Sequence, residues 1–194
     1  MFLREQGEAS MGLPHFDKPT TKTLLSVSLL NEYLDRNISE ICPHGYADDS
    51  LNHCAHFVCH VASLATGAVT CRQMSGGSKV KNSGVCIRVH ELFHACPAVG
   101  EFDEATPAQK ESGVFVFVTS PTAVKLATKT MTNLPKKHVG IFHAGTIWHY
   151  SNTKDKVVTA TPAEFKSHYK SQTNGLYFGT LPKTAVVVRF GNGL

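Results

Sequence analysis

The chain has 194 residues, 42% of them hydrophobic, and a formal net charge of +4 with 11 histidines besides. This length and apolar content suffice for one domain with a sizeable core. No run of about 20 apolar residues could span a bilayer, and Glu5 and Glu8 stand where a signal peptide needs an apolar segment. We therefore expect a chain made in the cytoplasm, without a membrane span or a cleaved signal.

Lysine and arginine are dispersed, with their densest groups at residues 79–81 and 136–137. A nucleic-acid-binding stripe is therefore not expected, although the mild positive charge suits an anionic polymer. The six cysteines are expected first as free thiols, because the small size and secretory context that favour disulfides are missing. One pair, such as Cys42 with Cys71 or Cys86 with Cys96, is the alternative.

The first half of the chain has mostly helical signals. Residues 1–22 are predicted as an irregular arm before a single domain over residues 23–194. Apolar spacing predicts a helix over residues 24–34 and another that starts at or just before Cys54 and ends by Gly67. A loop over residues 75–83 leads to a short helix over residues 89–96, which Pro97 ends.

The second half has mostly strand signals. Runs of β-branched and aromatic residues predict strands over residues 114–119, 139–143, 147–151, 157–160, 176–181 and 185–190. One helix interrupts them, with Thr161 as N-cap, Pro162 in the first turn, Glu164 completing a capping box and a body over residues 165–169. Helices followed by strands predict an α+β domain with a mostly antiparallel sheet.

Cys54 is a candidate nucleophile because it lies in the predicted first turn of a helix. Unpaired amides and the positive end of the helix dipole lower the pKa of a thiol at that position. The same amides, including that of Cys54, are candidate oxyanion donors, and Tyr46 is a further one. Cys59, one turn deeper, is expected in the core.

His138 is the candidate base, and the hairpin after it supplies the group that orients it. If Ala144 and Gly145 form a two-residue turn, His138 and His149 are diagonal neighbours on one face, about 7–8 Å apart at the backbone. A three-residue turn slips the register by one residue and puts Asn152 in that place. We favour His149, because the slipped register buries its imidazole on the other face.

Two segments of the chain resemble the NlpC-type and CHAP-type cysteine peptidases. They are Asn-His-Cys-Ala-His-Phe-Val over residues 52–58, and His-Val-Gly-Ile-Phe over residues 138–142 with His149 downstream. The resemblance covers about residues 46–152. It implies a papain-like domain with N-terminal helices packed on the sheet, in which Cys54, His138 and His149 hydrolyse a peptide or amide bond of peptidoglycan.

The chain differs from this family at the residues around the nucleophile, and one of its segments is also similar to a second family. Family members often have Asp-Cys-Ser or Asn-Cys-Ser at the nucleophile, where this chain has His53-Cys54-Ala55. The phrase Cys-Ala-His-Phe-Val is also similar to the lecithin retinol acyltransferase group, in which the histidine comes before the cysteine. The opposite order here favours amide hydrolysis over acyl transfer.

Hydrolases of this type without a signal peptide resemble amidase effectors injected into rival bacteria and phage lytic enzymes. That likeness implies delivery to the periplasm or cell wall of a target cell by a route independent of a signal peptide. For an effector it also implies a cognate immunity protein as partner. No cofactor is expected.

Two other function classes stay open. The segment His-Glu-Leu-Phe-His over residues 90–94 matches the HExxH pattern, so a zinc-dependent hydrolase with His90 and His94 as ligands is the alternative. A structural zinc at Cys86, His90, His94 and Cys96 is a related option. The other class is a non-catalytic cell-wall-binding module.

Two further assignments concern side chains outside the proposed site. His56 and His60, one turn apart on the predicted helix, are assigned to packing or to the helix surface. Phe142, Trp148 and Tyr150 belong either to the core or, in a binding module, to a sugar-stacking surface.

Overall fold

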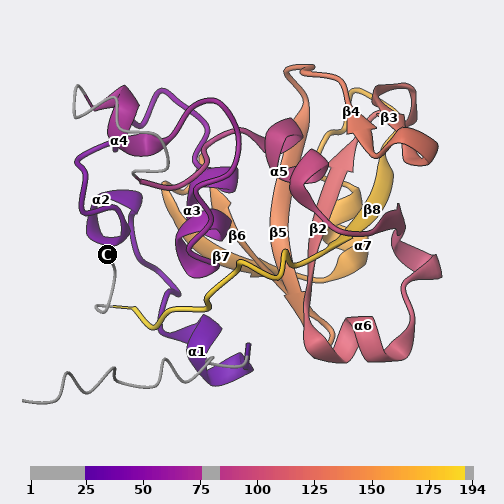
Figure 1. Cartoon of the computed structure of the whole chain (residues 1–194), viewed down its shortest axis with the longest axis horizontal. Coiled ribbons are helices and arrows are strands. Elements are labelled where there is room, and N and C mark those ends of the chain that lie inside the picture. Colours follow the sequence, from indigo (N-terminus) through magenta and orange to yellow (C-terminus); the bar gives the residue numbers. More distant parts are fainter. Residues whose placement is uncertain (1–24, 76–83, 191–194) are drawn as a thin grey trace, which may run out of the picture.

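A computed structural model describes residues 25–75 and 84–190 (Figure 1). The arm predicted over residues 1–22 and most of the loop predicted over residues 75–83 lie outside the described residues. The helices are α1 (Val27–Asn31), α2 (Ile38–Ile41), α3 (Cys54–Val61), α4 (Cys71–Met74), α5 (Val89–Ala95), α6 (Pro107–Ser112) and α7 (Pro162–Lys166). Short 3-10 turns cover Phe102–Glu104, Pro121–Ala123 and Leu126–Thr128.

The strands form one large sheet and a small ribbon. They are β1 (Val99–Glu101), β2 (Val114–Thr119), β3 (Val124–Lys125), β4 (Thr130–Met131), β5 (Lys137–His143), β6 (Thr146–Ser151), β7 (Lys156–Ala160) and β8 (Gly175–Thr180). The large sheet has the order β1-β8-β2-β5-β6-β7, and the described neighbours pair antiparallel. The predicted α+β class with a mostly antiparallel sheet is therefore confirmed.

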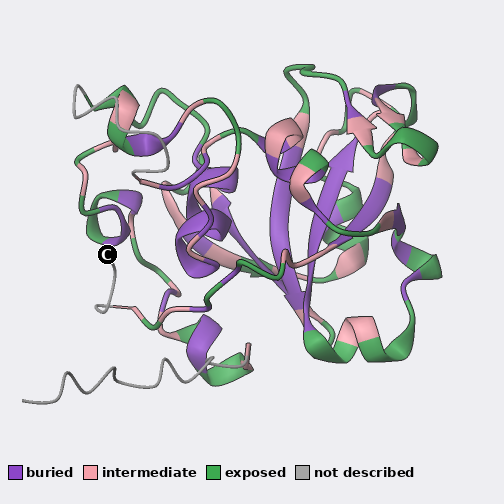
Figure 2. Cartoon of the chain, viewed as in Figure 1, coloured by how far each residue is buried: buried purple, intermediate pink, exposed green. Residues whose placement is uncertain are grey.

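The sheet carries a hydrophobic core on each face. Alternate residues of β5 and β6, among them Val139, Ile141 and Trp148, pack with α3. Figure 1 shows where α3 lies, and Figure 2 shows that this helix is buried. The intervening residues, such as Phe142 and Ile147, pack with Phe165 of α7. Side chains alternate across a strand, so each residue's position along β5 decides which core it enters.

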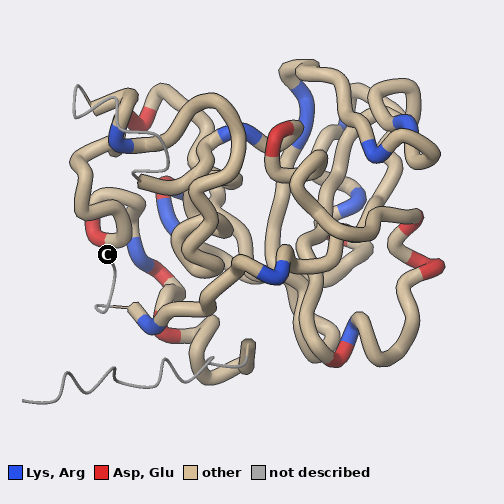
Figure 3. The backbone as a smooth tube through the Cα atoms, viewed as in Figure 1, with Lys and Arg blue, Asp and Glu red and all other residues tan. Residues whose placement is uncertain are grey.

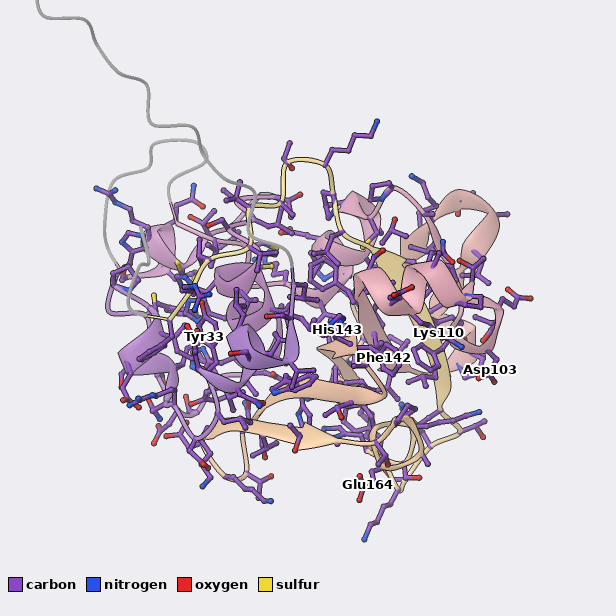
Figure 4. The ribbon with its side chains drawn as sticks, turned by 90° about the horizontal axis from the view of Figure 1, so that it is seen from below. Tyr33, Asp103, Lys110, Phe142, His143 and Glu164 are labelled. Carbon is purple, nitrogen blue, oxygen red and sulfur yellow. The ribbon has the colours of Figure 1, made fainter. Side chains whose placement is uncertain are left out.

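The β5–β6 hairpin has the predicted register. Ala144 and Gly145 form its turn with φ of 47° and 85°, as a type I′ turn requires at both central positions. Cα partners are His143 with Thr146 and Ile141 with Trp148. Figure 4 shows Phe142 and His143 beside Lys110 of α6, at the turn end of the hairpin. His138 lies at the opposite end of β5.

Several predicted elements differ from the structure at their ends. The helix predicted to start at Cys54 does start there, and it ends at Val61. Two residues later, Ser63 adopts a left-handed φ of 48°, which does not continue a helix. The predicted strand over residues 185–190 is wrong. Its amides at Val186 and Val188 instead donate to the carbonyls of Ala62 and Val61, each at 3.0 Å, so tertiary contact with the end of α3 replaces sheet pairing.

Charged side chains are spread over both halves of the fold (Figure 3). Lys156 pairs with Asp35 at 2.7 Å and Arg189 with Glu32 at 2.6 Å, which are exposed or partly exposed pairs of small energetic weight. Within the part of the chain that the structure describes, no helix is long and apolar enough to cross a bilayer.

Gly140 keeps the β5–β6 hairpin tightly packed, and its replacement by alanine should destabilise the fold. A Cβ there would lie 2.6 Å from Ile147 Cγ2, 2.9 Å from the Trp148 carbonyl oxygen and 3.1 Å from His149 Cβ. We expect Gly140→Ala to lower the free energy of unfolding by about 1–3 kcal/mol, measured by urea denaturation. Thr159→Ala, at an exposed position of β7, is the control. Equal stability of both variants would show that the close packing is absent.

Candidate functional site

Cys54 begins α3, and the loop before it is fixed by two asparagines. Asn52 Oδ1 accepts a hydrogen bond from the Cys54 amide at 3.0 Å. Asn152 donates from Nδ2 to the Leu51 carbonyl at 2.6 Å and accepts from the His53 amide at 3.3 Å. The Cys54 amide donates to Asn52 in this structure, and its part in an oxyanion hole stays a prediction.

The Cys54 thiol is buried, with 1% of the residue exposed. Burial raises the pKa of the thiol to about 11. The backbone amides of Val139 and Ala55 oppose that shift, because both can donate to the thiolate. A thiolate at Cys54 thus has donors in place, but the free protein keeps the group protonated at neutral pH.

His138 and His149 form a hydrogen-bonded pair across β5 and β6. His138 Nε2 lies 2.9 Å from His149 Nδ1, and the rings meet edge to face. The other ring nitrogen of His138, Nδ1, is buried and has no hydrogen-bond partner in the described part of the chain. The two histidines predicted to be diagonal neighbours are therefore in contact, and His138 Nδ1 remains available to accept a proton.

Both histidines resist protonation. Burial, followed by the neighbouring charges of His149 and His168, holds the pKa of His138 well below its usual range. Burial and then His168 lower the pKa of His149 to about 4. The pair is therefore neutral at pH 7, which is the state in which an imidazole accepts a proton.

Helix α7 and the residues after it hold the rings in place. His168 stacks on His138 with ring centroids 4.2 Å apart and an interplanar angle of 8°. Phe165 contacts both His138 and His149, at 5.4 and 5.2 Å between centroids. From the sequence, His168 is predicted only as part of a helix. The residues around it carry no signal that α7 packs against β5.

Cys54 and His138 approach each other from opposite faces of the sheet. Cys54 belongs to the core under α3, whereas the His138 ring packs with Phe165 of α7. They meet at the start of β5, where the thiol lies next to the amide of Val139, the residue after His138. The structure contains no hydrogen bond between the thiol and the imidazole, since His138 Nδ1 has no partner.

Asn152, the alternative third residue, makes its side-chain hydrogen bonds away from His138, whose ring bonds to His149. Its side chain binds the loop at Leu51 and His53, because the two-residue turn places it beyond the end of β6. Tyr46, the further oxyanion candidate, packs its ring against His53 and His56 at 5.5 and 5.3 Å.

A cavity of about 230 Å³ opens beside Cys54. Its lining includes Asn52, His90 and the cations Arg88 and Lys137. Arg88 pairs with Glu91 at 3.3 Å, whereas Lys137 forms no ion pair with any described residue. Burial lowers the pKa of Lys137, and the Cys54 charge opposes this. The space next to the thiol thus presents an uncompensated cation.

The HExxH segment does not form a metal site among the described residues. His94 Nε2 accepts from the Met131 amide at 3.1 Å, and Glu91 binds Arg88 and the Ala68 amide. The rings of His90 and His94 are 6.3 Å apart at nearly right angles. His90 Nδ1 is buried and has no hydrogen-bond partner among the described residues, so tertiary packing, and not helical spacing alone, sets the two rotamers.

The related structural zinc site at Cys86, His90, His94 and Cys96 is also not assembled. The Cys86 thiol is close to that of Cys59, and Cys96 Sγ donates to the Leu92 carbonyl at 3.3 Å. Cys59 is fully buried, as predicted. The aromatic residues Phe142, Trp148 and Tyr150 are also buried, so they form core and not a sugar-stacking surface.

One cluster of metal-ligating side chains does exist, at a place where the sequence analysis expected packing. It joins Cys42, His56, His60 and Cys71, whose ligand atoms all lie within 4.8 Å of one another, and all four residues are buried. The six cysteines are free thiols. Cys42 and Cys71 are therefore close, as one disulfide prediction required, but they are accompanied by two histidines.

The chain matches no protein-family model, no curated protein and no solved structure. Its site must be interpreted from its own geometry.

The depressed pKa of His149 predicts that stability falls on acidification. His149 takes up a proton near pH 6.5 in the unfolded chain but only near pH 4 in the folded chain. Protonation of His149 therefore favours the unfolded state between these two pH values. From pH 7 to pH 4 we expect His149 to account for about 3 kcal/mol of lost stability. Denaturation of wild type and His149→Asn at both pH values checks this. An identical pH dependence of the two proteins would refute it.

Proposed function

We propose that the chain is a papain-like cysteine hydrolase that cleaves a peptide or amide bond of peptidoglycan. The observation that supports this most is the His138–His149 hydrogen bond at 2.9 Å, next to a buried Cys54 at the start of α3. His138 keeps a buried, unpartnered nitrogen, and the Cys54 thiol lies against the next amide of the same strand.

In the proposed mechanism His138 donates from Nε2 to His149 Nδ1, so His138 Nδ1 carries the lone pair. The mechanism requires the Cys54 thiol and that nitrogen to come into contact in the substrate complex. His138 Nδ1 takes the thiol proton while sulfur attacks the substrate carbonyl carbon, and the amine then leaves with that proton. Water, deprotonated by His138, releases the acyl group from the sulfur. His149 fixes the tautomer and stabilises the imidazolium.

The helix start supplies the electrostatics of the reaction. The Ala55 amide, on the first turn of α3, and the Val139 amide both face the sulfur and stabilise its charge. Tyr169 lies within electrostatic reach of Cys54, whose negative charge adds to burial in raising the tyrosine pKa. Its hydroxyl joins that of Tyr46 as a candidate donor to the oxyanion.

The cavity next to Cys54 is suited to an anionic substrate. Lys137 lines it without a carboxylate partner among the described residues, and burial of its ammonium disfavours the charge. A carboxylate in the cavity would relieve that cost. Peptidoglycan stem peptides carry free carboxylates, and the net charge of +4 favours approach to such a polymer. Delivery to a target cell's wall and an immunity protein remain parts of the same proposal.

The mechanism predicts which substitutions abolish cleavage of purified sacculi. Cys54→Ala and His138→Ala should lower the rate at least a hundredfold, because each removes a group that takes part in bond making or proton transfer. His143→Ala changes a histidine at the other end of β5 and should retain the wild-type rate. The measurement is mass analysis of the released fragments.

Two results would contradict the thiol mechanism. Cys54→Ala with wild-type cleavage would exclude it outright. Loss of activity in Glu91→Gln at unchanged stability would point to the HExxH glutamate. No fragments from any form, wild type included, would leave peptidoglycan without support as substrate.

Asn152 and Lys137 should act on different kinetic parameters. Asn152→Ala removes two hydrogen bonds to the loop before Cys54, so we expect kcat to fall about tenfold through misplacement of the nucleophile. Lys137→Met retains the length of the side chain but removes its charge, so KM for a carboxylate-bearing peptide should rise about tenfold with kcat little changed. Equal KM for acidic and amidated peptides in wild type would show that Lys137 does not recognise a carboxylate.

A further inference from the structure

We infer that Cys42, His56, His60 and Cys71 form a structural zinc site that anchors α3. This inference is independent of the proposed hydrolase activity, because it stands on a different set of side chains. Two sulfur and two nitrogen ligands are a donor set that favours tetrahedral Zn²⁺, and four protein ligands leave no open coordination position.

The distances in the cluster are close to those of a tetrahedral site, so small side-chain adjustments would let the four ligands enclose an ion. Zn–N bonds of about 2.0–2.1 Å and Zn–S bonds of about 2.3 Å put ligand atoms roughly 3.3–3.8 Å apart. His56 Nε2 and His60 Nε2 are 3.1 Å apart, and Cys71 Sγ is 4.0 Å from His60 Nε2. Cys42 lies within hydrogen-bonding reach of Cys71 and of both histidines. Ligand atoms therefore converge on one point from three segments of the chain.

A chain of hydrogen bonds gives His56 the tautomer that a metal needs. The Asp48 carbonyl lies 2.8 Å from His53 Nε2 and can only accept, so His53 Nε2 carries the proton. In neutral His53, Nδ1 then accepts from His56 Nδ1, at 3.1 Å. This leaves the lone pair of His56 on Nε2, the nitrogen that points into the cluster. Such support from a second residue is typical of metal-binding histidines.

Cys71 has equivalent support from a backbone amide. The Val85 amide donates to Cys71 Sγ at 3.3 Å, as amides do to metal-bound thiolates. Two thiolates neutralise the charge of Zn²⁺, so the filled site carries no net charge into the core. Cys42 and His60 also line a cavity of about 190 Å³ with Tyr33, labelled in Figure 4, which gives the ion a way in from the surface.

A bound metal would link the short helices α2 and α4 to α3. Cys42 caps the end of α2, His56 and His60 lie on α3, and Cys71 begins α4. Cys54 stands two residues before His56, so an ion at this site fixes the helix that presents the thiol. A disulfide between Cys42 and Cys71 is the competing outcome, since their thiols are neighbours.

Metal content of the full-length protein tests the site. Wild type purified under reducing conditions without chelator, then given zinc and dialysed, should hold about one zinc per chain. Cys42→Ser/Cys71→Ser and His60→Ala should each lose at least nine-tenths of it. Cys96→Ala changes a buried cysteine outside the cluster and should keep the full amount. Cobalt-loaded wild type should show absorption bands of tetrahedral geometry with thiolate charge transfer, which reports on the ligands even if a variant fails to fold.

Three outcomes would overturn the inference. They are wild type that retains no zinc after loading, cluster variants that retain all of it, and a non-reduced mass spectrum that shows Cys42 crosslinked to Cys71. None of these measurements uses hydrolase activity, so failure of the zinc site and failure of the proposed function can be told apart.

Discussion

Burial of the whole of α3 is the constraint on which the rest of the site depends. All eight residues of the helix are buried, although they include two histidines and two cysteines. Polar groups inside a protein need partners, because an unpaired one costs about 1–3 kcal/mol. His56 bonds to His53 before the helix and to His60 within it, His60 also contacts Cys71, and the Val139 amide next to the Cys54 thiol comes from β5.

The sheet imposes the complementary constraint. Its two faces carry separate cores, so His138 and His149 lie among the side chains of α7 while Cys54 lies under α3. The two groups can meet only at the start of β5, where the start of α3 lies next to the start of the strand. A site at that edge packs against both cores, which favours the fixed geometry that the proposed proton transfer requires.

Histidine chemistry at the two sites differs for a physical reason. Among the described residues, the His138–His149 pair has one buried nitrogen without a partner and no sulfur among its hydrogen-bond partners, which suits the proposed base. His56 has both ring nitrogens engaged, one by His53 and one by the cluster, as a metal ligand would have. The hydrogen-bond partners thus distinguish the proposed base from the proposed metal ligands, which residue type alone does not do.

The sequence by itself determined the features that depend on neighbouring residues. The start of α3 at Cys54, the cap of α7 at Thr161 and the two-residue turn at Ala144 and Gly145 were confirmed, since capping groups and positive φ act over a few positions. That turn set the register, and the register put His149 beside His138. The papain-like identity of the fold stays a proposal.

Only the tertiary structure decided which distant residues share a site. Cys42 and Cys71 flank His56 and His60 at spacings that no local rule connects, although a histidine pair one helical turn apart was a signal for metal binding. The same holds for His168 on His138 and for Asn152 on the loop before Cys54. Packing of α7 and of that loop against the sheet brings them together, and such contacts are selected by burial over the whole chain rather than by the residues next to them.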